Sequence, residues 1–223
     1  MINQQNLYKE HKPSFTKRVY RRSLLSFMSS KAYSWPMLHV IPYIRFSFYY
    51  TSLPGWKYRR GYQLLQPGDM VVTNDKWKLT SMLIPGEFSH GALCLSKDAT
   101  DKFEIAEMTH ENLVESTFYD LCAQATRVAI IRCNDWDEDY VNSVIIPNCI
   151  YFRNIGIKYD TIFLLGVKAL YCSELPIACD KEKRLKVSYE DLAGLGRPYI
   201  SPTGLFRASN ITIVWDSNNE IKP

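Results

Sequence analysis

The sequence predicts an α+β fold that carries a basic extension at its N-terminus. Short apolar runs typical of strands are mixed with helical segments, without the regular alternation that a doubly wound sheet requires. The 223 residues are 46% hydrophobic and 22% charged, which is typical of a globular protein that can bury a sizeable core. This composition excludes collagen-like and disordered proteins.

Charge divides the chain near residue 60. Residues 1–60 hold eleven Lys or Arg and one acid, a net charge of +10, whereas residues 61–223 hold sixteen and twenty-two, a net charge of −6. The sum is the +4 of the whole chain. Pro54-Gly55 predicts a turn close to this division. We expect a basic, aromatic-rich extension over residues 1–60 and a mildly acidic globular body over residues 61–223.

The extension is expected to begin with a helix over residues 14–30, with Ser14 or Thr16 as its N-cap. Residues 33–56 are apolar and aromatic, but three prolines and Arg45 argue against a membrane-spanning helix. Residues 1–12 lack the apolar stretch of a secretory signal, so we expect a cytoplasmic protein.

The body is expected to contain both strands and helices. In chain order they are a turn and strand over 65–73, a helix over 76–83, a hairpin of 90–96 with 102–108, a helix over 116–123, a strand over 127–132, a helix over 137–152 with a kink at Pro147, a helix over 171–178, and a last strand over 211–215.

The predicted hairpin brings together a histidine and a carboxylate. If its loop is residues 97–100, opposed residue numbers sum to 197, so that His90 faces Glu107 and Cys94 faces Phe103. Directly opposed Cβ atoms are about 4.5–5.5 Å apart. Glu107 would then fix the tautomer of His90 and leave its other ring nitrogen to act as a base. A slip of one residue would put Glu107 on the opposite face.

The six cysteines predict buried, free thiols in a reducing compartment. They form no Cys-x-x-Cys motif and no Cys/His cluster with zinc spacing, so we expect no metal and no other cofactor. Cys172 is the best candidate nucleophile, because it begins the helix predicted over 171–178 and a helix N-terminus lowers a thiol pKa. Cys94 is a weaker candidate, because it is expected to face the core.

Six short segments resemble the permuted branch of the NlpC/P60 papain-like superfamily, which includes the YiiX/YaeF-like proteins. They are Pro67-Gly68-Asp69, Ser89-His90-Gly91, Ile105-Ala106-Glu107, the run from Gly156 to Asp160, the run from Tyr171 to Leu175, and Ile200-Ser201-Pro202. They occur in the order of that branch, with the histidine strand before the cysteine. The resemblance implies a circularly permuted papain-like fold, a small antiparallel sheet or partial barrel packed against helices.

The resemblance also implies a cysteine hydrolase. Cys172 would be the nucleophile, His90 the base and Glu107 the group that orients it, with Ser89 and Tyr171 contributing to substrate binding. Residues 61–223 would form the catalytic domain. The implied substrate is an amide, such as a cell-wall-type peptide or a related small amide.

Alternative functions remain at this point. One is a thiol acyltransferase or a lipid ester or amide hydrolase at a membrane surface, which the basic, aromatic extension would suit by peripheral contact. The same aromatics would otherwise pack on the body. Another is an inactive papain-like binding module. A nucleic-acid binder is not favoured, because the body is acidic and no nucleic-acid motif is present.

Overall fold

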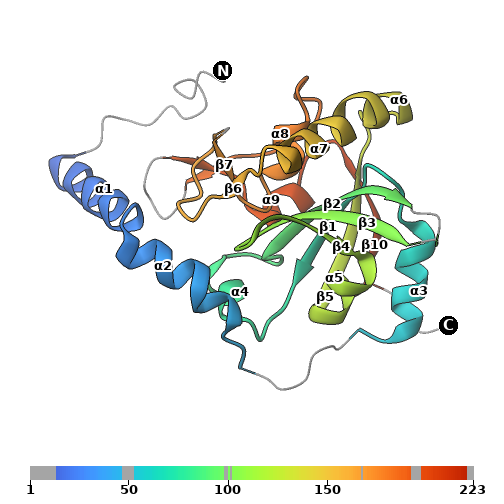
Figure 1. Cartoon of the computed structure of the whole chain (residues 1–223), viewed down its shortest axis with the longest axis horizontal. Helices are drawn as coiled ribbons and strands as arrows, with labels where there is room; N and C mark the ends of the chain where they lie inside the picture. Colours follow the sequence, from blue (N-terminus) through green and yellow to red (C-terminus); the bar gives the residue numbers. More distant parts are fainter. Residues whose placement is uncertain are drawn as a thin grey trace.

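The core of the protein is an antiparallel sheet, as seen in a computed structural model that describes residues 14–46, 53–97, 100, 102–166, 168–191 and 197–219. Six strands run in the order β10-β5-β1-β2-β3-β4, and every neighbouring pair is antiparallel (Figure 1). Their bounds are β1 Met70–Asn74, β2 His90–Lys97, β3 Phe103–Thr109, β4 Asn112–Thr117, β5 Arg127–Cys133 and β10 Ile211–Asp216. The predicted α+β class is confirmed.

Helices and two small sheets complete the described structure. The helices are α1 Phe15–Met28, α2 Lys31–His39, η2 Ile41–Tyr43, α3 Gly55–Leu64, α4 Leu79–Leu83, α5 Phe118–Gln124, α6 Glu138–Tyr140, η3 Val141–Ile145, α7 Ile146–Asn154, α8 Leu175–Cys179 and α9 Pro202–Phe206. The two-stranded sheets pair β6 Lys158–Tyr159 with β7 Ala169–Leu170, and β8 Glu190–Asp191 with β9 Pro198–Tyr199.

Both faces of the six-stranded sheet are covered, because alternate residues of its strands point to opposite sides. On β1, Met70 and Val72 enter one hydrophobic cluster and Val71 enters the other. Helices α7, α8 and α9 pack on the first face, whereas α3 and α5 pack on the second (Figure 1). The inner strands β1, β2 and β5 are therefore buried along nearly their whole length.

The first two helices form an arm, defined here as residues 15–46, beside the sheet (Figure 1). The helix predicted over 14–30 is confirmed as α1, and the Ser14 hydroxyl accepts a hydrogen bond from the Lys17 N–H at 3.3 Å. The end of the arm joins the body. Tyr43 hydrogen-bonds His110 at 2.9 Å, Arg45 pairs with Asp75, and the Phe46 N–H donates to the Trp77 carbonyl at 2.8 Å.

Helix α3 packs on the body. Its Tyr58 stacks on Phe118 with ring centroids 5.7 Å apart, and a Cβ at Gly61 would lie only 3.0 Å from the Trp215 ring. The predicted division at residue 60 falls within this helix and stays a prediction. Residues 1–13, which include part of the predicted extension, lie outside the described residues.

The hairpin of β2 and β3 is confirmed, but its predicted register is wrong by two residues. Ala92, not His90, lies opposite Glu107, and Cys94 lies opposite Ile105 rather than Phe103. The ladder is shifted by an irregularity between Cys94 and Ser96 that residue counting does not reveal. Because side chains repeat with a period of two, this shift leaves His90 and Glu107 on the same face.

Two further expectations concern the helices. The helix predicted over 137–152 is found as the successive elements α6, η3 and α7, of which η3 is π-helical, and the kink or break predicted at Pro147 stays a prediction. The helix predicted over 171–178 begins later than expected. Helix α8 starts at Leu175 with Pro176 in its first turn, and Cys172 lies in the turn before it. Strand β4 was not predicted, because it is an edge strand in which no residue is fully buried.

Candidate active site

His90 and Glu107 are held together by the central sheet. His90 is the first residue of β2 and pairs with Thr73 of β1, while Glu107 lies on β3. Their side chains reach each other diagonally, with His90 Nε2 2.6 Å from Glu107 Oε2. The carboxylate engages Nε2, so Nδ1 is the ring nitrogen left to serve a reacting group.

Cys172 lies far from His90 in the sequence but close to it in the fold. It follows β7 in the turn that leads to α8, and its side chain is buried. A Cβ at Gly91 would lie 3.6 Å from the Ser173 Cα, so β2 and this turn are in contact. Cys172 and His90 line the same cleft, and the His90 side chain and the backbone of Gly91 and Ser173 lower the pKa of the thiol. The structure thus brings together His90, Glu107 and Cys172.

The electrostatics of this cluster favour the charged forms of all three groups. Burial alone would raise the pKa of Cys172, but the hydrogen bond and charge of His90 lower it below its ordinary value. Burial alone would lower the pKa of His90, but hydrogen bonds to Cys172 and Glu107 raise it to about 10. Burial opposes ionisation of Glu107 as well, yet contact with His90 lowers its pKa. The arrangement is that of a thiolate beside an imidazolium.

The origin of the low thiol pKa differs from the expectation. Sequence reasoning assigned it to a helix N-terminus, but Cys172 precedes the first residue of α8. His90 and backbone hydrogen bonds from Gly91 and Ser173 lower the pKa instead.

The other cysteines whose pKa shifts are resolved have raised rather than lowered pKa values. Burial raises the pKa of Cys122 to about 12 and that of Cys133 to about 11, and it raises those of Cys94 and Cys179 as well. All six cysteines are free and buried, which confirms the expected free thiols. Of the six, only Cys172 lines the cleft described next.

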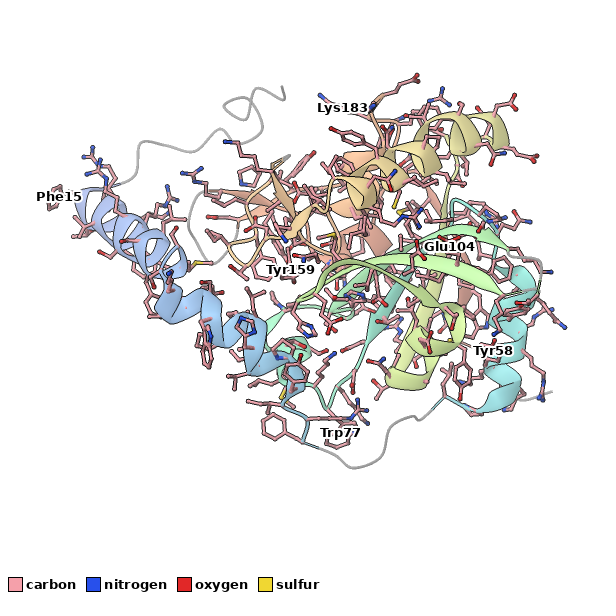
Figure 2. All side chains as sticks on the ribbon, viewed as in Figure 1. Phe15, Tyr58, Trp77, Glu104, Tyr159 and Lys183 are labelled. Atoms are coloured by element: carbon pink, nitrogen blue, oxygen red, sulfur yellow. The ribbon has the colours of Figure 1, made fainter. Side chains whose placement is uncertain are left out.

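Cys172 and His90 open into a cleft of about 760 Å³ between the arm and the body. This volume lies within the ~300–1,000 Å³ of typical small-molecule sites. Its wall includes Glu107 and Ser89 on the sheet, Lys78 and Ser81 near α4, and Tyr159 and Phe163 near β6. Figure 2 shows Tyr159 between the arm and the long helices above the sheet.

The two residues expected to bind substrate are placed differently. Ser89 lines the cleft, and its hydroxyl is hydrogen-bonded to the Ser81 hydroxyl at 2.8 Å. Tyr171 does not reach the cleft. Its side chain is fully buried against Phe163 and Tyr199, and its hydroxyl accepts a hydrogen bond from the Ile200 N–H at 3.1 Å. Tyr171 therefore stabilises the turn that carries Cys172 and does not line the cleft.

Sequence reasoning missed the wall formed by residues 159–166. Asp160 accepts hydrogen bonds from the N–H groups of Ile162 at 2.8 Å and Leu164 at 2.7 Å, which folds the loop back on itself. Glu174 accepts a third from the Gly166 N–H at 2.7 Å, and burial raises the pKa of Glu174 to about 8. The segment from Gly156 to Asp160 was the only part of this wall that the sequence analysis singled out, and nothing in it indicated that it lines a cleft.

The described residues contain neither a candidate metal site nor a candidate membrane-spanning helix. No group of three or more His, Cys, Asp or Glu side chains in this part of the chain is arranged to hold a metal ion. Within the same residues, no helix is both long and apolar enough to cross a membrane.

The sequence that forms this site matches a known protein family. Residues 64–204 match the sequence model of a family described as permuted papain-like amidase enzymes, YaeF/YiiX, family C92. The matched segment covers more than half of the chain and includes the turn of Cys172 and both strands that carry His90 and Glu107. No curated protein matches the chain.

Proposed function

The chain belongs to the YaeF/YiiX family of permuted papain-like amidases, and from this premise we propose that it hydrolyses an amide with a Cys172–His90–Glu107 triad. One observation carries the proposal. A cleft-lining thiol with a lowered pKa contacts an imidazole whose far nitrogen is held by a carboxylate at 2.6 Å. A nucleophile, a base and a group that orients the base are the parts that thiol catalysis requires.

In the proposed mechanism, the Cys172 thiolate attacks the amide carbonyl. Backbone N–H groups of the turn that carries Cys172 stabilise the oxyanion, and one such donor is typically worth about 2.7–4 kcal/mol in the transition state. His90 then protonates the leaving amine through Nδ1. Water, deprotonated by the same nitrogen, cleaves the acyl-enzyme.

Glu107 has a separate task in this scheme. Its carboxylate holds the His90 ring in one orientation and stabilises the imidazolium formed during the reaction. Because Glu107 is itself largely buried, its charge acts on His90 with little screening by solvent.

An electrophilic probe tests the proposal without knowledge of the substrate. The full chain is treated with iodoacetamide at neutral pH, and the alkylated peptides are mapped over time. We expect Cys172 to react first, and His90→Ala to slow it to the rate of an ordinary thiol. Cys133→Ser is the matched control, because Cys133 lies outside the cleft. Reaction of Cys133 or Cys122 as fast as Cys172 would contradict the proposal.

A further inference from the structure

The polar part of the cleft wall contains an unpaired cation. Lys78 is the only Lys or Arg among the described residues that line the cleft, and it is half-buried at the start of α4. Within the described part of the chain, its ammonium group takes part in no hydrogen bond and no ion pair. A charge held partly away from water without a partner is unfavourable. Its presence in this wall therefore indicates that a ligand supplies the missing anion.

The carboxylates of the cleft wall do not neutralise Lys78. Four carboxylates line the cleft, and each of them has a partner other than Lys78. The four pairs are Asp75 with Arg45, Glu107 with His90, Glu111 with His110, and Asp120 with Thr117. Among the described residues, no carboxylate of the wall is thus left for the Lys78 ammonium. We therefore expect its counter-charge to come from a bound molecule.

The charge of Lys78 acts on the catalytic residues. Burial raises the pKa of Glu107, contact with His90 lowers it, and the charge of Lys78 lowers it further. Burial also lowers the pKa of His110, and the charge of Lys78 adds to this effect. Because the interaction of two charges weakens with distance, Lys78 lies close to the catalytic carboxylate. An anion bound to Lys78 would lie beside the reacting bond.

Ser81 provides a hydroxyl donor next to Lys78. The Ser81 N–H donates to the Lys78 carbonyl at 3.0 Å, so the two residues are three apart in one turn, a spacing that brings side chains together. The Ser89 hydroxyl donates to the Ser81 hydroxyl at 2.8 Å, which leaves the proton of Ser81 for a ligand. Ser89 directly precedes His90, the first residue of β2. This pair of hydroxyls therefore joins the turn of Lys78 to the catalytic strand.

We propose that Lys78 and Ser81 bind a carboxylate of the substrate, so that the amide cleaved at Cys172 carries a free carboxylate close to the reacting bond. This inference rests on the proposed hydrolase function and names its substrate class. A carboxylate has one negative charge and two acceptor oxygens, which match one ammonium and one hydroxyl. A phosphate group carries a charge of about −1.5 to −2, which one lysine does not balance.

Paired alkylating probes test the subsite without a known substrate. N-iodoacetyl-β-alanine ends in a carboxylate, and its terminal carboxamide is a neutral counterpart of the same length. Both carry the same reacting group, so the ratio of their rates with Cys172, charged over neutral, reports binding of the charge. The full chain is labelled at neutral pH, and the shorter glycine pair and the longer γ-aminobutyrate pair are measured alongside, so that the carboxylate is presented at three distances from Cys172.

The sign of the charge at residue 78 should decide this rate ratio. We expect Lys78→Gln to lower the ratio about fivefold for at least one of the three pairs, Lys78→Glu to lower it further, and Lys78→Arg to keep most of it. Lys76→Gln is the matched control. It removes the same charge two residues away, but Lys76 is exposed and does not line the cleft, so the ratio should stay unchanged. Loss of folding would lower both rates and cannot imitate a change in their ratio.

The outcomes separate the subsite from the hydrolase function. Equal rate ratios in the wild type, Lys78→Gln and Lys78→Glu overturn the subsite, and so does an equal fall in Lys76→Gln. If N-iodoacetyl-aminoethyl phosphate depends on Lys78 more strongly than the carboxylate probes do, the assignment to a carboxylate is overturned. Slow labelling of wild-type Cys172 by the neutral probes overturns the hydrolase function on which the subsite depends.

Discussion

At the scale of the residue, the thiol of Cys172 should titrate unlike any ordinary cysteine. Because contact with His90 lowers its pKa, the thiolate is present at pH values where a free thiol, with a pKa of about 8.5, is mostly protonated. The pKa of His90 is raised to about 10, so the ion pair persists up to that pH. We expect the alkylation rate of Cys172 to fall only on acidification below its lowered pKa, and to stay level from neutral pH to about 10.

Glu107 should act on His90 rather than on the substrate. Glu107→Gln keeps the shape of the side chain but removes its charge, so the pKa of His90 should fall and the alkylation profile of Cys172 should move to higher pH. His90→Ala removes the base, and we expect it to cost about 10²–10⁴-fold in turnover. The loss in Glu107→Gln should be smaller.

A neighbouring carboxylate provides the control for Glu107. Glu104 lies on the same strand and pairs with Ser96 at 2.9 Å and Arg153 at 3.2 Å, away from His90. If Glu104→Gln shifts the pH profile of Cys172 as far as Glu107→Gln does, the assigned role of Glu107 is wrong.

At the scale of the element, one ion pair with a buried carboxylate joins the start of β1 to β5. Asp69 is completely buried and receives two hydrogen bonds from Arg132, at 2.7 and 2.8 Å, and a third from the Gln66 N–H at 2.8 Å. We expect Asp69→Asn to lower the free energy of unfolding by about 1.5–3 kcal/mol, because it weakens the hydrogen bonds that the buried carboxylate accepts. Chemical denaturation measures the loss, and Glu182→Gln, at an exposed pair with Arg184, should change it little.

The elements also show how far sequence reasoning reaches. The strand at residues 127–132 follows from its apolar content and was predicted correctly, as was a helical segment over 137–152, which is found as α6, η3 and α7. The register of β2 on β3 depends on an irregularity within the ladder. The start of α8 depends on a turn for which the residues near Cys172 give no local signal. Local patterns thus placed His90 and Glu107 on the same face of the sheet but did not give the residue pairing between their strands.

At the scale of the whole molecule, the arm depends on a small junction with the body. The Arg45–Asp75 ion pair lies there, with Asp75 buried, next to the backbone hydrogen bond from Leu79 N–H to the Ile44 carbonyl at 3.0 Å. We expect Asp75→Asn to loosen this junction and to raise the rate of hydrogen exchange in α1 and α2, while β5 stays protected. Equal protection of the arm in the variant and the wild type would show that other contacts hold it.

The cleft itself could not be read from the sequence. Its walls come from regions far apart in the chain, which are the arm, α4, α5, the strands of the sheet, the loop after β6 and the turn of Cys172. The chemistry of the site is local enough to be predicted from short segments, whereas its shape arises only when these regions pack together.

The late position of Cys172 in the chain has a consequence for biosynthesis. A ribosome adds about 5–20 residues per second from the N-terminus, so the strands with His90 and Glu107 emerge before the thiol. Until Cys172 leaves the exit tunnel and docks against β2, it has no imidazole beside it and keeps the pKa of an ordinary cysteine. The order of segments thus delays the reactive thiolate until strands β1 to β5 of the sheet have been made.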